Sequence, residues 1–236
     1  VFGGGQPDWG RIAPQAGQRR FYQGPELLDY AAKDPTHFRL SATGEELGVT
    51  PVGQAALSFS LPSRRRREAE SPHPHFRDEG EGLRVSAWKN TYAPRLNGQA
   101  LDILETYETS RSVDLAQGQV VLGADWYLYG LDGSGQRQWK TPVPGAAYAV
   151  KIAAQRPVVA AALGDGTIRW YRLRDGEPLL SLLLHPDGRW LLWTPSGYYD
   201  AAPGAEDLIG WHVNQGLDQA PLYHPASKFR DTYHRP

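Results

Sequence analysis

Hydrophobic and polar residues alternate over short stretches of this chain, and turn residues separate the stretches. Phe38–Ser41 alternates, residues 42–45 supply a turn, and Glu46–Val49 resumes the extended pattern, which predicts a β-hairpin. Leu83–Trp88 alternates in the same way. Because side chains along a strand point to opposite faces with a period of two, this pattern favours short β-strands.

Two longer stretches share one plan of four short strands. Val120 and Val158 occupy matching places 38 residues apart, and Asp132 and Asp175 begin matching Asp-Gly turns 43 residues apart. Repeats of this length, built from short strands and turns, are typical of a β-propeller, in which four-stranded sheets called blades bury their faces against one another. The sequence therefore predicts an all-β propeller with four-stranded antiparallel blades. Residues 113–184 should form two successive blades without a helix of two or more turns.

The rest of the chain divides by composition. Residues 1–61 are expected to form degenerate blades, residues 62–82 an exposed loop rich in Arg and Pro, residues 83–214 further blades including the final one, and residues 215–236 a C-terminal tail leading to a following domain. This is too little chain for a ring of seven blades of about 40 residues each, so we expect an incomplete ring. Its missing blades would come from the same polypeptide or a second chain. An open ring would also expose the apolar face of its terminal blade.

A known signature lies in the second of the two clear repeats. Thr167–Gly176 resembles the third strand of WD-repeat propellers, with Tyr171 and Arg172 where that family has Trp and Asp.

The last third of the chain carries a second resemblance. His185–Trp190, Trp193–Asp200, Ile209–Asn214 and Phe229–Asp231 resemble the final blade of bacterial propeller proteins that are often fused to a caspase-like peptidase. This resemblance implies a sensor or regulatory module. It does not extend to peptidase activity, because the chain has no cysteine to match the catalytic one.

Composition narrows the function further. The chain has 236 residues, of which 40% are hydrophobic, and its 25 basic and 26 acidic residues leave a net charge of −1. We therefore predict neither a nucleic-acid partner nor a membrane, since no excess positive charge is available and the apolar runs are shorter than the roughly 18 residues of a membrane span. Cytoplasm is the default compartment. Without cysteine, a phosphate-binding loop, an HExxH motif or a GxSxG motif, the chain is predicted to be no enzyme and to need no cofactor.

A run of four arginines is the most prominent candidate site. Arg64, Arg65, Arg66 and Arg67 form either an anion-binding loop, because guanidinium groups bind oxyanions through paired hydrogen bonds, or a loop open to arginine-specific proteolysis. The nearby residues His73, His75, Asp78 and Glu79 offer nitrogen and oxygen ligands for a metal. Since Pro and Gly surround them, a solvated loop without metal is the favoured interpretation.

Aromatic residues near the end of the chain form a second candidate. This segment could stack a sugar or a peptide, or it could pack between blades, and Tyr199, Asp200 and His212 are the members expected to face solvent. The predicted function is a non-catalytic scaffold for protein–protein recognition, or for regulation of an attached or neighbouring caspase-like effector. The alternative is a propeller that binds a carbohydrate or small ligand with the aromatic residues of its last blade, and a hydrolase is a weaker third option.

Overall fold

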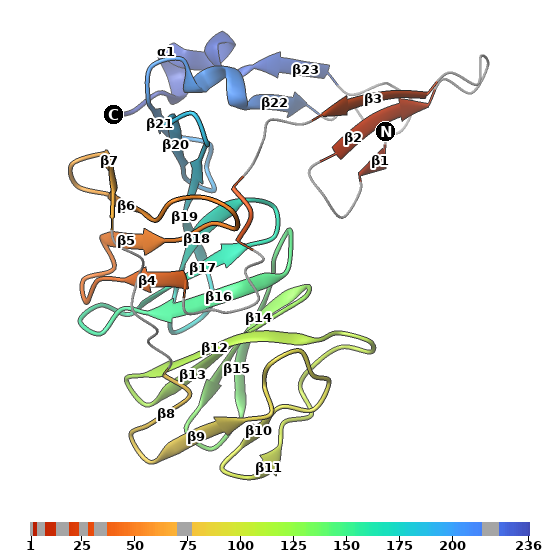
Figure 1. The fold of residues 1–236 in the computed structure, drawn as a ribbon, viewed down its shortest axis with the longest axis vertical. Coiled ribbons are helices and arrows are strands. Elements are labelled where there is room, and N and C mark those ends of the chain that lie inside the picture. The colour runs from red at the N-terminus through yellow and green to blue at the C-terminus, as the bar shows by residue number, and fades with distance from the viewer. Residues whose placement is uncertain are drawn as a thin grey trace. The chain divides into compact units, whose positions relative to one another are not determined.

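A computed structural model describes residues 2–3, 8–12, 19–23, 28–30, 37–69, 77–213 and 222–236, and most of its regular structure is strand (Figure 1). The chain divides into two compact units. The larger unit is Asp29–Leu179, and the smaller one combines Val1–Leu28 with Leu180–Pro236.

Four antiparallel sheets, here called blades 1 to 4 in chain order, contain the described strands of the larger unit. In each blade the strands lie side by side in the order of the sequence. Blade 1 contains β4 (Phe38–Leu40), β5 (Glu46–Val49), β6 (Leu57–Ser60) and β7 (Arg65–Glu68), and blade 2 contains β8 (Glu79–Gly80), β9 (Leu83–Ser86), β10 (Arg95–Leu96) and β11 (Gln99–Ala100). Blade 3 contains β12 (Ser110–Ala116), β13 (Gln119–Ala124), β14 (Tyr127–Asp132) and β15 (Arg137–Pro142), and blade 4 contains β16 (Ala147–Ile152), β17 (Val158–Leu163), β18 (Thr167–Arg172) and β19 (Pro178–Leu184), whose last residues belong to the smaller unit. The predicted all-β fold and the two blades in residues 113–184 are confirmed.

Apolar side chains fill the space between neighbouring blades. One cluster joins blades 2 and 3, and another joins blades 3 and 4. Trp139 on β15 belongs to the second cluster, and its indole Nε1 donates a hydrogen bond to the carbonyl oxygen of Leu173 at 2.7 Å. Its ring lies directly over Gly130, where a Cβ atom would come within 2.0 Å of the indole. Glycine at position 130 is therefore required by close packing.

The blades contact one another in an order that differs from the sequence. Strand β8 contacts β12, β12 contacts β16, and β16 contacts β4, so the series runs through blades 2, 3, 4 and 1. Trp170 Nε1 donates a hydrogen bond to the carbonyl oxygen of Gly44 at 2.9 Å, and Arg156 pairs with Glu45 at 3.0 Å. Blade 1 is thus held by blade 4, and the described strands of this unit form an open series, as the expected incomplete ring requires.

Both terminal blades of this series turn a polar face outward. On blade 1 the exposed face carries Arg39 and Arg67, and on blade 2 it carries Arg84 and Arg95. The expectation that the terminal blade exposes an apolar face is wrong for these described strands. The physical reason is that a terminal repeat with no neighbour needs a polar outer face to stay soluble.

The expected loop at residues 62–82 is also corrected. Arg65–Glu68 forms β7, which pairs with β6 from Leu57 to Ser60, and Glu79–Gly80 forms β8. An edge strand packs against only one neighbour, so it can form from a sequence with few apolar residues. His73 and His75 lie outside the described residues.

The described residues of the smaller unit form three sheets or hairpins. The N-terminal strands β1 (Phe2–Gly3), β2 (Asp8–Ile12) and β3 (Arg19–Gln23) form an antiparallel sheet. The strands β20 (Trp190–Trp193) and β21 (Tyr199–Ala201) pair with each other, and β22 (Gly210–Val213) pairs with β23 (Leu222–Pro225). Short helices among the described residues of this unit are η2 (Ala205–Leu208), η3 (Ala226–Phe229) and α1 (Arg230–Tyr233).

The described part of the expected C-terminal tail packs back onto this unit. The backbone N–H of Arg235 donates to the carbonyl oxygen of Tyr199 at 2.8 Å, and His234 forms a parallel bridge with Tyr199. A following domain stays a prediction. None of the helices in the described ranges has the length and hydrophobicity needed to cross a bilayer.

Candidate functional site

The outer face of blade 1 carries a row of polar and small residues across its four strands. Arg39 on β4 lies opposite Gly48 on β5, Gly48 lies opposite Ser58 on β6, and Ser58 lies opposite Arg67 on β7. Paired residues share a face of the sheet, so these four side-chain positions point the same way. The residues between them, such as Phe59, are buried on the opposite face.

A second row lies beside the first. Glu46 on β5 pairs with Ser60 on β6, and Ser60 pairs with Arg65 on β7. At the end of β4, the Ser41 hydroxyl oxygen accepts a hydrogen bond from the backbone N–H of Glu46 at 3.0 Å, which fixes the turn between β4 and β5.

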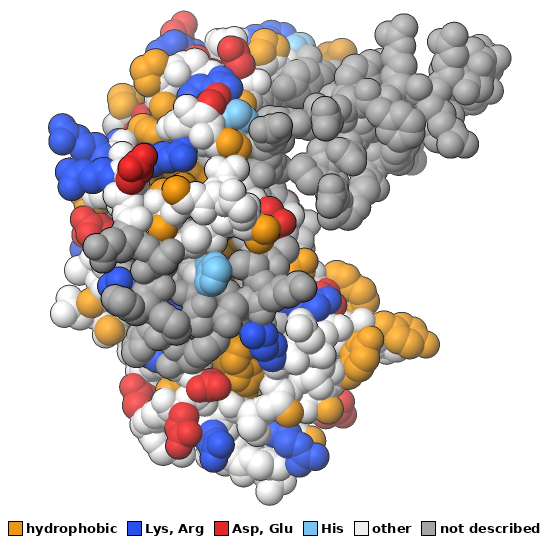
Figure 2. All heavy atoms as spheres, in the orientation of Figure 1, with side chains coloured by type: hydrophobic (Ala, Val, Ile, Leu, Met, Phe, Trp, Pro, Cys, Tyr) orange, Lys and Arg blue, Asp and Glu red, His pale blue; other side chains and the backbone are white. Residues whose placement is uncertain are grey.

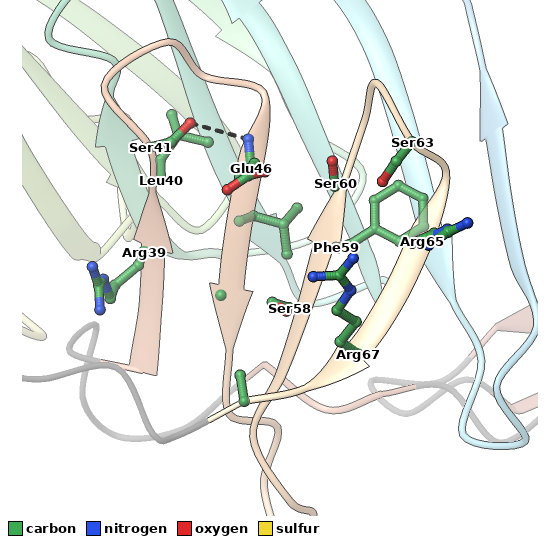
Figure 3. A pocket seen from close by; sticks show the side chains of 13 residues that line it. Arg39, Leu40, Ser41, Glu46, Ser58, Phe59, Ser60, Ser63, Arg65 and Arg67 are labelled. Carbon is green, nitrogen blue, oxygen red and sulfur yellow. Dashed lines mark hydrogen bonds between the residues drawn. The ribbon is translucent and has the colours of Figure 1, made fainter.

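The two rows enclose a hollow of about 280 Å³ (Figure 3). Its floor is low because the side chains of β5 and β6 on this face include those of Gly48, Ser58 and Ser60, which are small. The Arg67 side chain extends over the sheet beside Ser58, whereas Arg39 stands at the other side of the hollow (Figure 3). The lining residues are Arg39, Leu40, Ser41, Glu46, Leu47, Gly48, Ser58, Phe59, Ser60, Ser63, Arg65, Arg67 and Ala69.

The charge of this hollow is positive. Arg39, Arg65 and Arg67 are exposed, and no carboxylate among the described residues forms an ion pair with any of them. Among the described residues that line the hollow, Glu46 is the single acidic one. Figure 2 shows Lys and Arg side chains gathered over the β7 edge of blade 1. Since guanidinium groups stay charged throughout the physiological pH range, the hollow attracts anions.

The structure divides the predicted arginine run among three environments. Arg65 and Arg67 line the hollow. Arg66 is half-buried on the opposite face, close enough to Tyr30 that its positive charge partly offsets the rise in the pKa of Tyr30 caused by burial. Arg64 lies in the β6–β7 turn with a φ of 54° and donates a hydrogen bond to the carbonyl oxygen of Leu61. The alternating directions of strand side chains separate residues that are adjacent in sequence.

The second predicted surface differs from its expectation. Tyr199 is 2% exposed and Asp200 is 8% exposed, so neither faces solvent. The Tyr199 hydroxyl donates to Glu206 Oε1 at 2.8 Å, and burial together with this hydrogen bond raises the pKa of Tyr199 to about 12. Asp200 lies 3.8 Å from His234 Nε2. The side chain of His212 lies outside the part of the chain that the structure describes.

Other aromatic residues of this segment pack on the C-terminal helices. The ring centroids of Trp211 and Tyr233 are 4.5 Å apart, those of Trp211 and Phe229 are 5.8 Å apart, and those of Tyr198 and Tyr233 are 5.9 Å apart. These aromatic residues therefore pack on the C-terminal helices of the smaller unit, and packing between blades stays a prediction.

The predicted metal ligands that the structure describes have protein partners. Asp78 Oδ2 accepts a hydrogen bond from Trp88 Nε1 at 3.1 Å, and Glu79 pairs with Arg84 at 3.6 Å. No group of three or more metal-ligating side chains occurs within the described ranges.

Sequence reasoning missed three exposed aromatic residues on loops of the larger unit. Tyr92, Tyr107 and Trp126 are 67%, 83% and 47% exposed. Buried Glu108 ties two of these loops together, since its Oε1 accepts hydrogen bonds from the backbone N–H groups of Trp126 and Tyr127 at 3.0 and 3.1 Å. The sequence gives no periodic signal for them, because the residues belong to loops.

Comparisons with known proteins give loose similarities. No family model and no curated protein sequence matches the chain. Among solved structures, the computationally designed Ika8 protein is 15% identical with a TM-score of 0.37, over 73% of this chain and 62% of that one. A structure of U3-55K is 14% identical with a TM-score of 0.35, over 86% and 70% of the two chains. A chain of the mitotic checkpoint complex is 12% identical with a TM-score of 0.40, over 77% and 66%.

Proposed function

We propose that this chain is a non-catalytic propeller module that recognises an acidic segment of a partner protein in the hollow of blade 1. The observation that carries the proposal is the gathering of Arg39, Arg65 and Arg67 around one hollow, without ion-pair partners among the described residues. Arginine is favoured at protein interfaces because its planar guanidinium group binds carboxylates through two hydrogen bonds.

The shape of the site fits a polypeptide better than an enclosed small ligand. The hollow lies on an open sheet face and extends over all four strands of blade 1, from Arg39 to Arg67. Specific ligand pockets usually bury most of a small molecule, whereas this hollow lies open on a sheet face where Gly48, Ser58 and Ser60 have small side chains. A chain segment can cover such a surface and contact both sides.

The regulatory role belongs to the same proposal. Residues in the last third of the chain resemble the final blade of propellers fused to caspase-like peptidases, and a recognition module of this kind would position or restrain such an effector. The carbohydrate alternative has less support, because Trp211 and Tyr199 of the last segment are engaged in packing and hydrogen bonds.

A binding experiment with a polyglutamate peptide tests the proposal. Fluorescence anisotropy of the labelled peptide should rise with the complete chain at low salt and fall at about 0.5 M salt, where charge interactions are screened. The combined variant Arg39→Ala, Arg65→Ala and Arg67→Ala should bind at least tenfold more weakly. The matched control removes three arginines with ion-pair partners, through Arg169→Ala, Arg172→Ala and Arg174→Ala. Equal losses in both triple variants would contradict the proposal.

A further inference from the structure

We propose that the acidic segment binds in an extended conformation and that its acidic side chains occupy alternate positions. This inference rests on the proposed function, since it specifies which acidic segment the hollow of blade 1 selects. It follows from the register of the strands of blade 1 and from the small side chains on β5 and β6.

Arg65 and Arg67 set the spacing. They are two residues apart on one strand, and both line the hollow, while Arg66 between them lies on the opposite face. Two residues of a strand span about 7 Å, so the side chains of Arg65 and Arg67 leave the backbone at that separation. Side chains i and i+2 of an extended peptide have the same separation and point the same way. A peptide lying along β7 can therefore place one carboxylate at each guanidinium group.

The floor of the hollow allows a second chain to approach. Gly48 and Ser58 are directly opposed at its centre, and Ser60 lies beside them in the second row. These residues have small side chains, so a peptide backbone can lie over β5 and β6 without displacing a large group. The serine hydroxyls can donate hydrogen bonds to carbonyl or carboxylate oxygens.

The position of Arg39 favours an extended occupant over a single oxyanion. It lies on β4, three strand spacings from Arg67 on β7, and neighbouring strands are about 4.8 Å apart. The side chains of Arg39 and Arg67 leave the sheet about 14 Å apart and lie at opposite sides of the hollow, so in this arrangement they do not meet at one phosphate or carboxylate group (Figure 3). Since the acidic side chains of the peptide lie on the β7 side, Arg39 adds a longer-range attraction for acidic peptides that does not depend on their spacing.

Glu46 makes the two sides of the hollow differ in charge. It lies in the same row as Ser60 and Arg65, on the β5 side of the hollow. A carboxylate of the peptide is repelled there and attracted by Arg65 across the row. The acidic side chains that contact Arg65 and Arg67 therefore lie on the β7 side of the hollow.

Two peptides of equal length, composition and charge test the spacing. The alternating peptide is Glu-Ser-Glu-Ser-Glu-Ser-Glu-Ser, and the paired peptide is Glu-Glu-Ser-Ser-Glu-Glu-Ser-Ser, which contains no two glutamates at i and i+2. Their dissociation constants are measured with the complete chain by competition against labelled polyglutamate. The alternating peptide should bind at least fivefold more tightly, because it engages two charge-assisted contacts at once. Arg65→Ala or Arg67→Ala should abolish the preference, whereas Arg39→Ala should weaken both peptides by a similar factor.

The outcomes separate the inference from the proposed function. If both peptides bind equally and both are lost in the arginine triple variant, the recognition of acidic segments stands and the alternating spacing is wrong. A preference that survives Arg65→Ala and Arg67→Ala also overturns the inference. So does binding of polyglutamate with no measurable binding of either peptide. If polyglutamate itself does not bind, the proposed function fails.

Discussion

Blades 1 and 4 have the same strand order, but their arginines differ in whether a carboxylate of the fold pairs with them. In blade 4, Arg169 pairs with Asp165 at 3.0 Å and Arg172 pairs with Asp175 at 2.9 Å. In blade 1, the arginines of the hollow have no such partner among the described residues. The arginines of blade 4 are therefore neutralised within the fold, and those of blade 1 remain available to an outside anion.

The turns account for this difference. Asp165 precedes β18 in an Asp-Gly turn, and Asp175 follows β18 in another, so each turn supplies a carboxylate within reach of a β18 arginine. The turn between β6 and β7 is Leu61–Arg64, which contains no acid. The same strand plan thus leaves arginines paired or unpaired with carboxylates, depending on one or two turn residues.

The largest expected effect concerns the buried charges next to blade 4. Asp114 is fully buried, accepts hydrogen bonds from Ile152 N at 2.6 Å and Arg77 Nε at 2.9 Å, and lies 3.7 Å from Lys151 Nζ. Asp114→Ala leaves these groups without their acceptor, so the free energy of unfolding should fall by about 3–5 kcal/mol. Urea denaturation measures it. Arg67→Ala is the surface control and should change stability by less than about 0.5 kcal/mol. Similar losses of stability in both variants would show that the buried charges around Asp114 contribute no more to stability than the arginines of the hollow.

The next effect appears at alkaline pH. Burial raises the pKa of Tyr171 to about 12 from 10.0, with smaller opposing influences of Arg169 and Asp165. The unfolded chain therefore ionises this residue first. The stability that Tyr171 contributes is complete below pH 10 and is lost as the pH rises through 12. The loss should reach about 3 kcal/mol, because the pKa rises by about two and each pKa unit corresponds to 1.36 kcal/mol.

Comparison with Tyr171→Phe isolates this group from other alkaline titrations. The difference in stability between the two proteins should change between pH 10 and pH 12. A constant difference over that interval would be inconsistent with a buried, neutral Tyr171.

The contact that holds blade 1 on blade 4 should have a smaller effect. Trp170→Phe removes the donor to the Gly44 carbonyl, which is bonded at 2.9 Å, and leaves that acceptor buried. Unfolding free energy should fall by about 1–3 kcal/mol. Trp126→Phe is the matched control, because Trp126 is 47% exposed. Equal stabilities of the two variants would mean that this hydrogen bond does not hold the blade.

The smallest effects distinguish the two sets of arginines directly. Arg169→Ala and Arg172→Ala each remove an ion pair of blade 4, so each should cost about 0.2–1 kcal/mol of stability. Arg65→Ala and Arg67→Ala should cost less, or stabilise the protein slightly by relieving repulsion between like charges. Thermal unfolding at low salt measures the differences, and high salt should reduce them. A larger cost for Arg65→Ala than for Arg169→Ala would reverse the comparison.

The sequence predicts the central blades well because their signals are local. The continuous apolar run Val158–Leu163 and Asp-Gly turns such as Asp175-Gly176 indicate strands and hairpins without distant contacts. Strand β7 is harder to predict, because a run of four arginines is typical of a solvated loop. Only pairing with β6 shows that Arg65 and Arg67 share one face.

The remaining differences between the prediction and the structure arise from contacts between residues that are distant in the sequence. Tyr199 is buried because Glu206, His234 and Arg235 return to it from later in the chain. Blade 1 contacts blade 4 through Trp170 and Gly44, 126 residues apart. A strand pattern read along the sequence does not reveal either partner.

Mapping the peptide-binding face by NMR tests the central claim most directly. The complete chain, labelled with ¹⁵N, is titrated with the alternating glutamate–serine peptide, and shifts of backbone amides and arginine Nε–H groups are followed. The account predicts the largest shifts at Gly48, Ser58 and Ser60 and at the side chains of Arg39, Arg65 and Arg67, with little change at Arg169 and Arg172. The largest shifts at the paired arginines of blade 4, or around Trp126, would contradict it.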